Sequence, residues 1–320
     1  VLGRSTKLYV AGHLGLVGSA IYRCLVGKGF ENLIVRSHLQ LDLTDQAKTR
    51  EFFQIEKPEV VIVAAAKVGG IHANSTYPAE FVHSNLAIQA NVIHEAYEIG
   101  VKQLVFLGSS CIYPRNCPQP MQEKHLLTGK LEPTNRPYAL AKIVGIEMCW
   151  AYNRQYGTRY LAVMPTNAYG PGDNYDLNNA HVVPALIRKI HEAKKVNKSS
   201  FEAWGSGQVW REFLYSDDLA ESCVHLLNLP PEKLDFLFND EQPPLINVGS
   251  GVELTIRNLV EVISDVIGFR GEVIWDSTKP DGTPRKLLDG TRMEGLNWKP
   301  RIDLARGVSL AYEDFLRQGN

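Results

Sequence analysis

Tyr138 and Lys142, in the stretch RPYALAKIVGIE, have a spacing that could let them act together on a carbonyl group. On a helix, side chains at i and i+4 share one face. A tyrosine ordinarily ionises near pH 10, and a lysine ammonium beside it lowers the tyrosine pKa by charge attraction. Tyr138 could then donate a proton to a carbonyl oxygen while hydride arrives at the carbon, and Lys142 could also hold the ribose of a nicotinamide cofactor. The pair predicts a carbonyl-reducing site.

A second group of reactive side chains stands in GSSCIYP, where Ser109, Ser110 and Cys111 follow the apolar run QLVFL. This is the pattern of a buried strand that ends in a loop, and open α/β sheets bind their ligands at the carboxyl ends of their strands. Cys111 is either a small buried filler, which is a frequent role of cysteine, or an acid–base group. A thiol pKa near 8.5 suits proton transfer at neutral pH.

Three glycines, Gly12, Gly15 and Gly18, are regularly spaced in VAGHLGLVGSAI, between an apolar run and a helical pattern. They let the backbone turn tightly, approach a pyrophosphate and bring the helix against the sheet, while the helix amino terminus supplies N–H donors and partial positive charge. This position favours a dinucleotide cofactor over a purely structural turn. We further expect the cofactor site to include Leu16, Val17, Ala65, Lys142, Pro165, Asn167 and His181.

The stretch IVRSHLQLD bears on the choice of cofactor. A site for NAD usually places Asp or Glu at the end of the second strand, where it binds the ribose 2′-OH. Here Arg36 occupies that region. A cation suits a 2′-phosphate, so we expect NADPH (NADP+) rather than NADH, unless Arg36 is an ordinary solvated charge. Asp42 either reaches the adenine or simply precedes a helix capped by Thr44.

The elements that position these residues alternate along the first half of the chain. Helical patterns separate a series of apolar, β-branched runs that indicate strands. These predicted strands are KLYVAG, NLIVRS, EVVIVAAA, QLVFLGSS and RYLAVMP. This alternation predicts an α/β fold with a doubly wound parallel (Rossmann) sheet. We expect residues 7–170 to form the NADP-binding domain, with later segments, about 212–230, returning to it. Residues 171–320 would then form mainly a smaller, mixed α/β substrate-binding lobe.

Composition excludes several classes of partner. The 320 residues include 34 basic and 35 acidic side chains, a net charge of −1, so nothing draws the whole chain to nucleic acid or a membrane. The five cysteines show neither CxxC nor metal-ligand spacing, which is typical of a reduced, cytoplasmic protein without disulfides or a metal site. No apolar run reaches 18 residues.

Taken together, these residues make the chain resemble the extended short-chain dehydrogenase/reductases, and within them the enzymes that epimerise and reduce GDP-4-keto-6-deoxy-D-mannose to GDP-L-fucose. The resemblance spans about residues 7–315. It rests on long strings: AAAKVGGI, FLGSSCIYP, LEPTNRPYALAKI, MPTNAYGP, HVVPALIRKIHEA, WREFL and KPDGTPRKLLD. It implies a GDP-4-keto-6-deoxy-hexose as substrate and a homodimer formed through two long helices.

The resemblance also implies residue roles. Ser109 would hydrogen-bond the 4-keto oxygen beside Tyr138, while Cys111 and His181 would carry out epimerisation at C3 and C5. Those carbons flank the ketone, which acidifies their hydrogens, and both a thiol and an imidazole titrate near working pH. The substrate site would be completed by Ser110, Asn167, Lys189, Trp204, Arg211 and Lys286.

Alternatives remain open at several positions. His181 could merely cap or pack at a helix start, and Trp204 and Arg211 could be core and surface residues. The family's glycine loop usually reads GHRG, whereas Leu14 stands here in place of that arginine, which bears on the preference for NADPH. A related C4-reductase or epimerase acting on another GDP-4-keto sugar, such as a 6-deoxy-heptose, is the nearest alternative function.

Overall fold

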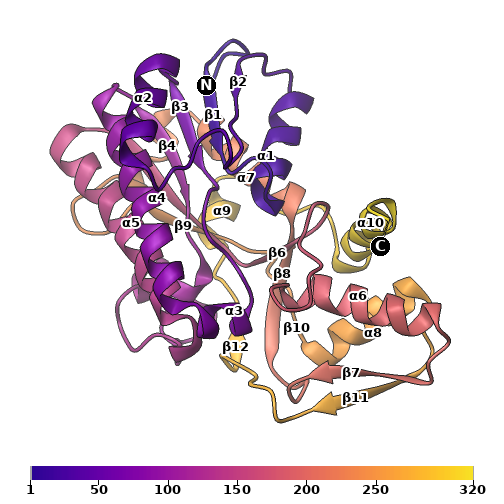
Figure 1. The fold of residues 1–320 in the computed structure, drawn as a ribbon. Helices are drawn as coiled ribbons and strands as arrows, with labels where there is room; N and C mark the ends of the chain where they lie inside the picture. Colours follow the sequence, from indigo (N-terminus) through magenta and orange to yellow (C-terminus); the bar gives the residue numbers. More distant parts are fainter. Residues whose placement is uncertain (1, 320) are drawn as a thin grey trace.

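The computed structural model describes residues 2–319 and has a central six-stranded parallel sheet in the order β2-β1-β3-β4-β5-β9 (Figure 1). Its strands are β1 (Leu8–Ala11), β2 (Leu33–Ile34), β3 (Val60–Val63), β4 (Gln103–Leu107), β5 (Arg159–Pro165) and β9 (Leu245–Val248). The chain passes from β1 outward to β2 and then to β3 on the other side of β1. The carboxyl ends of β1 and β3 therefore form the switch point at which such sheets bind ligands. The predicted α/β class with a Rossmann-like parallel sheet is confirmed.

Alternate residues of each strand enter two separate cores, because successive side chains point to opposite faces of a sheet. Tyr9 and Phe106 belong to the core beneath one helical layer, whereas Val10 and Val105 belong to the core on the opposite face. The first layer consists of α2 (Gln46–Glu56), α4 (Pro78–Glu98) and α5 (Arg136–Tyr156). The second consists of α1 (Leu16–Gly27), α7 (Ser216–Asn228) and α9 (Thr291–Gly295). Both faces are thus buried, as a doubly wound sheet requires.

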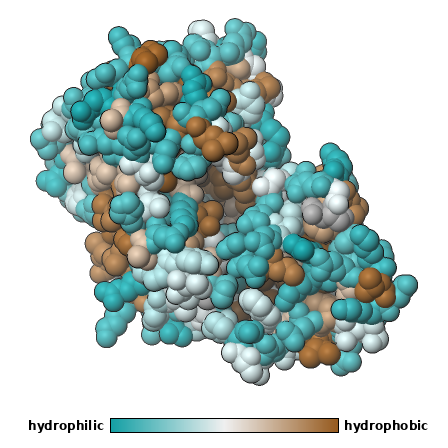
Figure 2. Space-filling model, in the orientation of Figure 1, coloured by the Kyte–Doolittle hydropathy of each residue, from teal (hydrophilic) through white to brown (hydrophobic). Residues whose placement is uncertain are grey.

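A third core holds the smaller part of the molecule together, at the lower right of Figure 1. Its helices are α6 (Val182–Lys195), α8 (Ile256–Ile267) and α10 (Leu304–Arg317). The strands outside the main sheet are β6 (Asn167–Tyr169), β7 (Ser200–Trp204), β8 (Trp210–Tyr215), β10 (Glu253–Thr255), β11 (Glu272–Asp276) and β12 (Arg285–Lys286). β8 pairs with β6, β10 and β12, and β7 pairs with β11. Figure 2 shows the surface hollowed between this part and the larger one.

Several element boundaries differ from the sequence-based expectation. The cap of α2 is Asp45, whose side chain accepts the Lys48 N–H at 3.1 Å, and not Thr44. The helix α4 begins at Pro78, with this proline in its first turn. β9 is a strand that periodicity does not reveal, although it returns residues beyond 240 to the main sheet. Within residues 2–319, no helix is long and apolar enough to cross a membrane.

Candidate active site

The glycine loop is a tight connection between β1 and α1. Gly12 has a φ of +83°, and a Cβ there would lie 2.7 Å from the backbone nitrogen of Ala65, at the end of β3. A Cβ on Gly18 would lie 2.0 Å from the carbonyl oxygen of Gly12, so that position also excludes a side chain. No side chain caps the amino terminus of α1, which begins with Leu16 and Val17. These uncapped N–H groups fit the pyrophosphate of a dinucleotide.

The adenosine end of the predicted cofactor site is less enclosed. Leu14 is 70% exposed. The guanidinium of Arg36 is 2.5 Å from a carboxylate oxygen of Glu56. Asp42 accepts hydrogen bonds from the backbone and hydroxyl of Thr44, at 2.9 and 2.7 Å, and these bonds lower its pKa. Arg36 and Asp42 therefore both have partners within the protein.

Ser109, Tyr138 and Lys142 come from two neighbouring elements, the end of β4 and the first turns of α5. The Lys142 ammonium donates a 2.7 Å hydrogen bond to the carbonyl of Leu107 and lies 4.8 Å from the centroid of the Phe106 ring. Its side chain is only 3% exposed, and burial lowers its pKa to about 7. The reductase-type residues predicted from spacing are thus brought together on one rigid unit.

The expected effect of Lys142 on Tyr138 is not seen in this arrangement. The Lys142 Nζ lies 5.8 Å from the Tyr138 ring centroid. Burial raises the Tyr138 pKa, the nearby Cys111 raises it further, and the Ser109 side chain acts in the opposite direction. Burial therefore dominates the pKa of Tyr138 in the described structure, and a lowering of that pKa by Lys142 stays a prediction.

Cys111 lies among nitrogen donors. The Asn135 amide donates to its Sγ at 3.0 Å, and the Lys286 ammonium lies 3.6 Å from the same sulfur. Cys111 also influences Arg211, whose own pKa burial lowers to about 10, so that Arg211 stays charged at neutral pH. Asn135 and Lys286 thus both direct polar hydrogens toward the Cys111 sulfur. Asn135 was not identified from the sequence, although it lies in the quoted string LEPTNRPYALAKI, just before α5.

His181 immediately precedes α6 and is linked electrostatically to the same lysine. The side chain of His181 is exposed to solvent, but protein groups crowded around it lower its pKa by desolvation, and the Lys286 charge lowers it further. The segment before it is held by the loop after β3, where the Gly70 N–H donates to the Asn179 carbonyl at 3.2 Å. Lys286 is therefore close to both Cys111 and His181, although it lies more than 100 residues from either in the chain.

The other predicted substrate residues lie along β7, β8 and α6. Trp204 is 47% exposed, and its ring centroid is 4.6 Å from the Lys189 ammonium and 5.3 Å from that of Lys279. Arg211 donates to the carbonyl of Asp281 at 2.9 Å. Cations grouped around an exposed indole fit a nucleotide, which offers both phosphates and a flat base. Lys279 was missed by sequence reasoning, although it lies in the quoted string KPDGTPRKLLD.

The remaining predicted residues are buried or bound to other parts of the protein. Asn167 donates its amide hydrogen to the Glu212 carbonyl at 2.8 Å, which joins β6 to β8. Ser110 is buried, and Pro165 ends β5 beside Val248 of β9. These three residues support the edge on which Ser109 and Cys111 stand.

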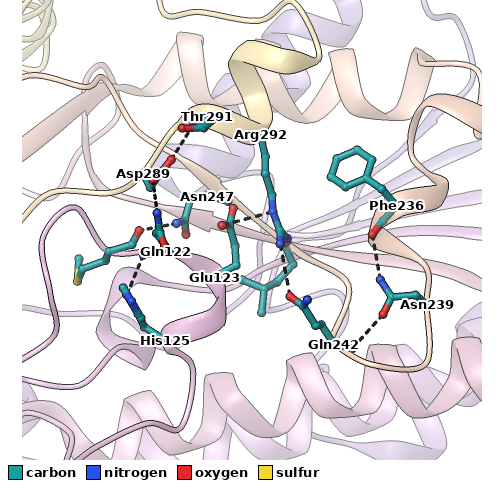
Figure 3. Close-up of polar contacts among 12 residues, drawn as sticks. Gln122, Glu123, His125, Phe236, Asn239, Gln242, Asn247, Asp289, Thr291 and Arg292 are labelled. Carbon is teal, nitrogen blue, oxygen red and sulfur yellow. Dashed lines mark hydrogen bonds and ion pairs between the residues drawn. The ribbon is translucent and has the colours of Figure 1, made fainter.

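A buried polar network holds the loop that follows Cys111 (Figure 3). The Tyr113 hydroxyl lies 2.6 Å from the Asn247 side-chain oxygen, and the Asn247 N–H donates to Glu123 at 3.0 Å. Arg292 of α9 lies 3.5 Å from the other Glu123 oxygen, and Gln122 donates to Asp289 at 2.9 Å. Burial raises the Glu123 pKa despite these contacts. The network fastens the loop to β9 and α9.

Comparison with known proteins gives consistent matches along the chain. The model of the NAD dependent epimerase/dehydratase family matches residues 8–239. Putative GDP-L-fucose synthase 2 of Arabidopsis thaliana is 55% identical over 316 residues, covering 99% of this chain and 93% of that protein. GDP-L-fucose synthase of Escherichia coli K12 is 50% identical over 312 residues, covering 97% and 96%.

One solved structure is informative about ligands. MlghC, a GDP-mannoheptose C4 reductase from Campylobacter jejuni with NADP bound, has a TM-score of 0.89 and 35% identity. The match covers 99% of this chain and 100% of that one.

Proposed function

The chain belongs to the NAD dependent epimerase/dehydratase family, and on this premise we propose that it converts GDP-4-keto-6-deoxy-D-mannose to GDP-L-fucose with NADPH. It is an enzyme that combines epimerisation with reduction, as its relatives at 50–55% identity over nearly full length do. Their shared name supports the sugar, and the NADP in the related heptose reductase supports the cofactor.

The observation that best supports this reading is the position of Cys111. Its thiol has nitrogen donors from Asn135 and Lys286, and it lies close enough to Tyr138 to affect the pKa of the phenol. A reductase alone has no need of a thiol held in this way. An epimerase does, because a base must remove a proton from a carbon beside the ketone and an acid must return one to the opposite face.

We assign the steps of epimerisation to this chain's own residues as follows. Cys111, as the thiolate, removes the proton from C3 or C5. The enolate oxygen that develops is stabilised by the side chains of Ser109 and Tyr138. His181, in its protonated form, delivers a proton to the opposite face. In the free protein the Lys286 charge disfavours protonated His181. A substrate diphosphate bound beside Lys286 would offset this charge and so favour protonated His181.

Reduction follows at C4 of the epimerised ketone. When bound, NADPH supplies the hydride. Tyr138 donates its proton to the C4 oxygen, Ser109 holds that oxygen, and Lys142 orients the ribose next to Tyr138. The glycine loop and the open amino terminus of α1 would hold the pyrophosphate.

The division of the chain follows the same scheme. We propose that residues 7–170 hold the cofactor together with the returning helix α7, and that the lobe formed mainly by residues 171–320 holds the GDP-sugar. Trp204, Lys189 and Arg211 would bind the nucleotide.

A second substrate is favoured by one comparison. The related structure from Campylobacter jejuni is named as a GDP-mannoheptose C4 reductase, so a GDP-4-keto-heptose is the alternative that deserves direct comparison. The higher identity to proteins named GDP-L-fucose synthase favours the hexose.

The experiment that tests the proposal is product identification by NMR in D2O, with NADPH or NADH supplied in turn. We expect GDP-L-fucose with deuterium at both C3 and C5. A reduced sugar without inversion at these centres, or turnover of a GDP-4-keto-heptose alone, would refute the assignment.

We also propose a homodimer formed through α4 and α5. The two helices lie side by side on one face of the sheet (Figure 1), and their outer surface has a stacked tyrosine cluster that includes Tyr97 and Tyr156. Leu140, Val144 and Tyr156 of α5 are each 40–43% exposed.

We further propose a cytoplasmic location, which is supported by the finding that all five cysteines are free thiols.

A further inference from the structure

Arg36, the residue expected to bind the 2′-phosphate of NADPH, is already paired with an acidic side chain. Its Nη2 lies 2.5 Å from a carboxylate oxygen of Glu56, the last residue of α2. A second guanidinium nitrogen donates to the carbonyl of Val35 at 2.8 Å. The other oxygen of Glu56 lies 3.4 Å from the Lys7 ammonium. Glu56 thus sits between two cations.

The pair directs the Arg36 side chain away from the cofactor edge. The Glu59 N–H donates to the Lys7 carbonyl at 2.8 Å, and both residues stand just before their strands, β3 and β1, begin. Glu56, three residues before Glu59, therefore lies at the amino edge of the sheet. The guanidinium of Arg36 lies 5.6 Å from the Phe52 ring centroid on its way to Glu56. The glycine loop, in contrast, stands at the carboxyl edge.

The backbone of Arg36 nevertheless remains beside the cofactor site. Desolvation lowers the pKa of His13 in the glycine loop, and the Arg36 backbone is close enough to act in the opposite direction. Rotation of the Arg36 side chain alone would therefore bring its charge toward that loop. Other cations offer little help, since Leu14 occupies the place of the family's arginine and the His38 ring lies 3.8 Å from Asp42.

We propose that Glu56 is a specificity-determining residue that competes with the cofactor 2′-phosphate for Arg36 and so limits the preference for NADPH over NADH. NADP+ must displace Glu56 from the guanidinium to be recognised, whereas NAD+ has no 2′-phosphate and leaves the ion pair intact. The inference rests on the proposed use of NADPH and is independent of which sugar is reduced.

The test is the affinity of the unliganded protein for NADP+ and NAD+, measured by isothermal titration calorimetry in low salt. Exposed ion pairs are weak, so we expect Glu56→Gln to tighten NADP+ binding about two- to fivefold and to leave NAD+ binding unchanged. Glu51→Gln removes the same charge from an exposed position of α2 and serves as the matched control. It should alter neither affinity.

A double-mutant cycle separates competition from a general change in charge. In an Arg36→Gln background, which removes the group competed for, adding Glu56→Gln should no longer tighten NADP+ binding. The inference is overturned if Glu56→Gln leaves NADP+ affinity unchanged, if it tightens NAD+ equally, or if its effect persists without Arg36. Failure of the wild-type protein to bind NADP+ at all would instead overturn the cofactor assignment, and with it this inference. Urea unfolding of each variant checks that the fold is retained.

Discussion

The two sets of reactive residues in the cleft are built in different ways. Ser109, Tyr138 and Lys142 stand on the end of β4 and on α5, which pack directly against each other through Lys142 and Phe106. Cys111 and His181 belong to different parts of the fold, the strand edge and the start of α6. Lys286, from a short strand paired with β8, lies beside them.

Because of this difference, the two sets of residues depend on different parts of the fold. The reductase set needs only the Rossmann part of the molecule, because its members share one helix–strand contact. The proposed epimerase set is complete only when the proposed smaller lobe supplies His181 and Lys286. Variants should therefore be able to remove one activity and leave the other.

The largest separation is expected from Tyr138→Phe. Without the phenol proton, reduction should fall by about 10²- to 10⁴-fold, measured as NADPH oxidation. Exchange of the C3 and C5 hydrogens with D2O depends on Cys111 and His181 and should continue at a rate within about tenfold of wild type, since the phenol also stabilises the enolate. Loss of both activities to the same extent would show that the two sets do not work separately.

Cys111→Ser should produce the opposite pattern. A hydroxyl is a far weaker base than a thiolate, so deuterium incorporation at C3 and C5 should fall by about 10²-fold or more. Affinity for NADP+ should be unchanged because Cys111 follows β4, whereas the glycine loop follows β1, two strands away in the sheet. Cys24→Ser, on α1, is the control. If Cys111→Ser still inverts both centres at the wild-type rate, the thiol is only a filler.

The same contrast explains how much could be predicted from the sequence. The pair Tyr138 and Lys142 is visible as i, i+4 spacing on one helix, and Ser109 and Cys111 follow directly from a strand ending. The parallel sheet is equally visible, because β-branched runs alternate with helical patterns. Local patterns of this kind need no knowledge of distant contacts.

What could not be predicted depends on contacts between distant segments. The Lys286 ammonium reaches Cys111 across 175 positions of sequence. Resemblance placed Lys286 in the substrate site, and no spacing rule connects it to a thiol. The direction of the Arg36 side chain is also set by a distant residue, because Arg36 pairs with Glu56. The sequence shows only that a positively charged residue follows β2. β9 is as long as β1 and β3, but it lies beyond the strand–helix alternation of the first half of the chain that marks those two strands.

A smaller effect on the rate of deuterium exchange is expected at Asn135. It tests whether the hydrogen bond from Asn135 positions the Cys111 thiol. Asn135→Ala removes the 3.0 Å hydrogen bond to Cys111 and should slow deuterium exchange at C3 and C5 about tenfold, while NADP+ affinity is retained. Thr134→Ala, whose hydroxyl bonds to Glu132 at 3.2 Å, is the neighbouring control. An unchanged exchange rate in Asn135→Ala would mean that Lys286 alone holds the thiolate.

A further effect, measured as stability and not as a rate, is expected from the burial of Lys142. Its pKa is lowered from the ordinary value near 10.4 to about 7 in the folded protein. Between these values the unfolded chain keeps a proton that the folded protein has lost, so this group makes the free energy of unfolding rise with pH, by at most about 1.4 kcal/mol per pH unit. Below pH 7 both states are protonated and the contribution is constant. Lys142→Met removes the titrating group, so the stability difference between wild type and variant, from urea unfolding without cofactor, should shift in favour of wild type between pH 7 and 9. A difference that is flat over this range would show that Lys142 stays charged in the folded protein.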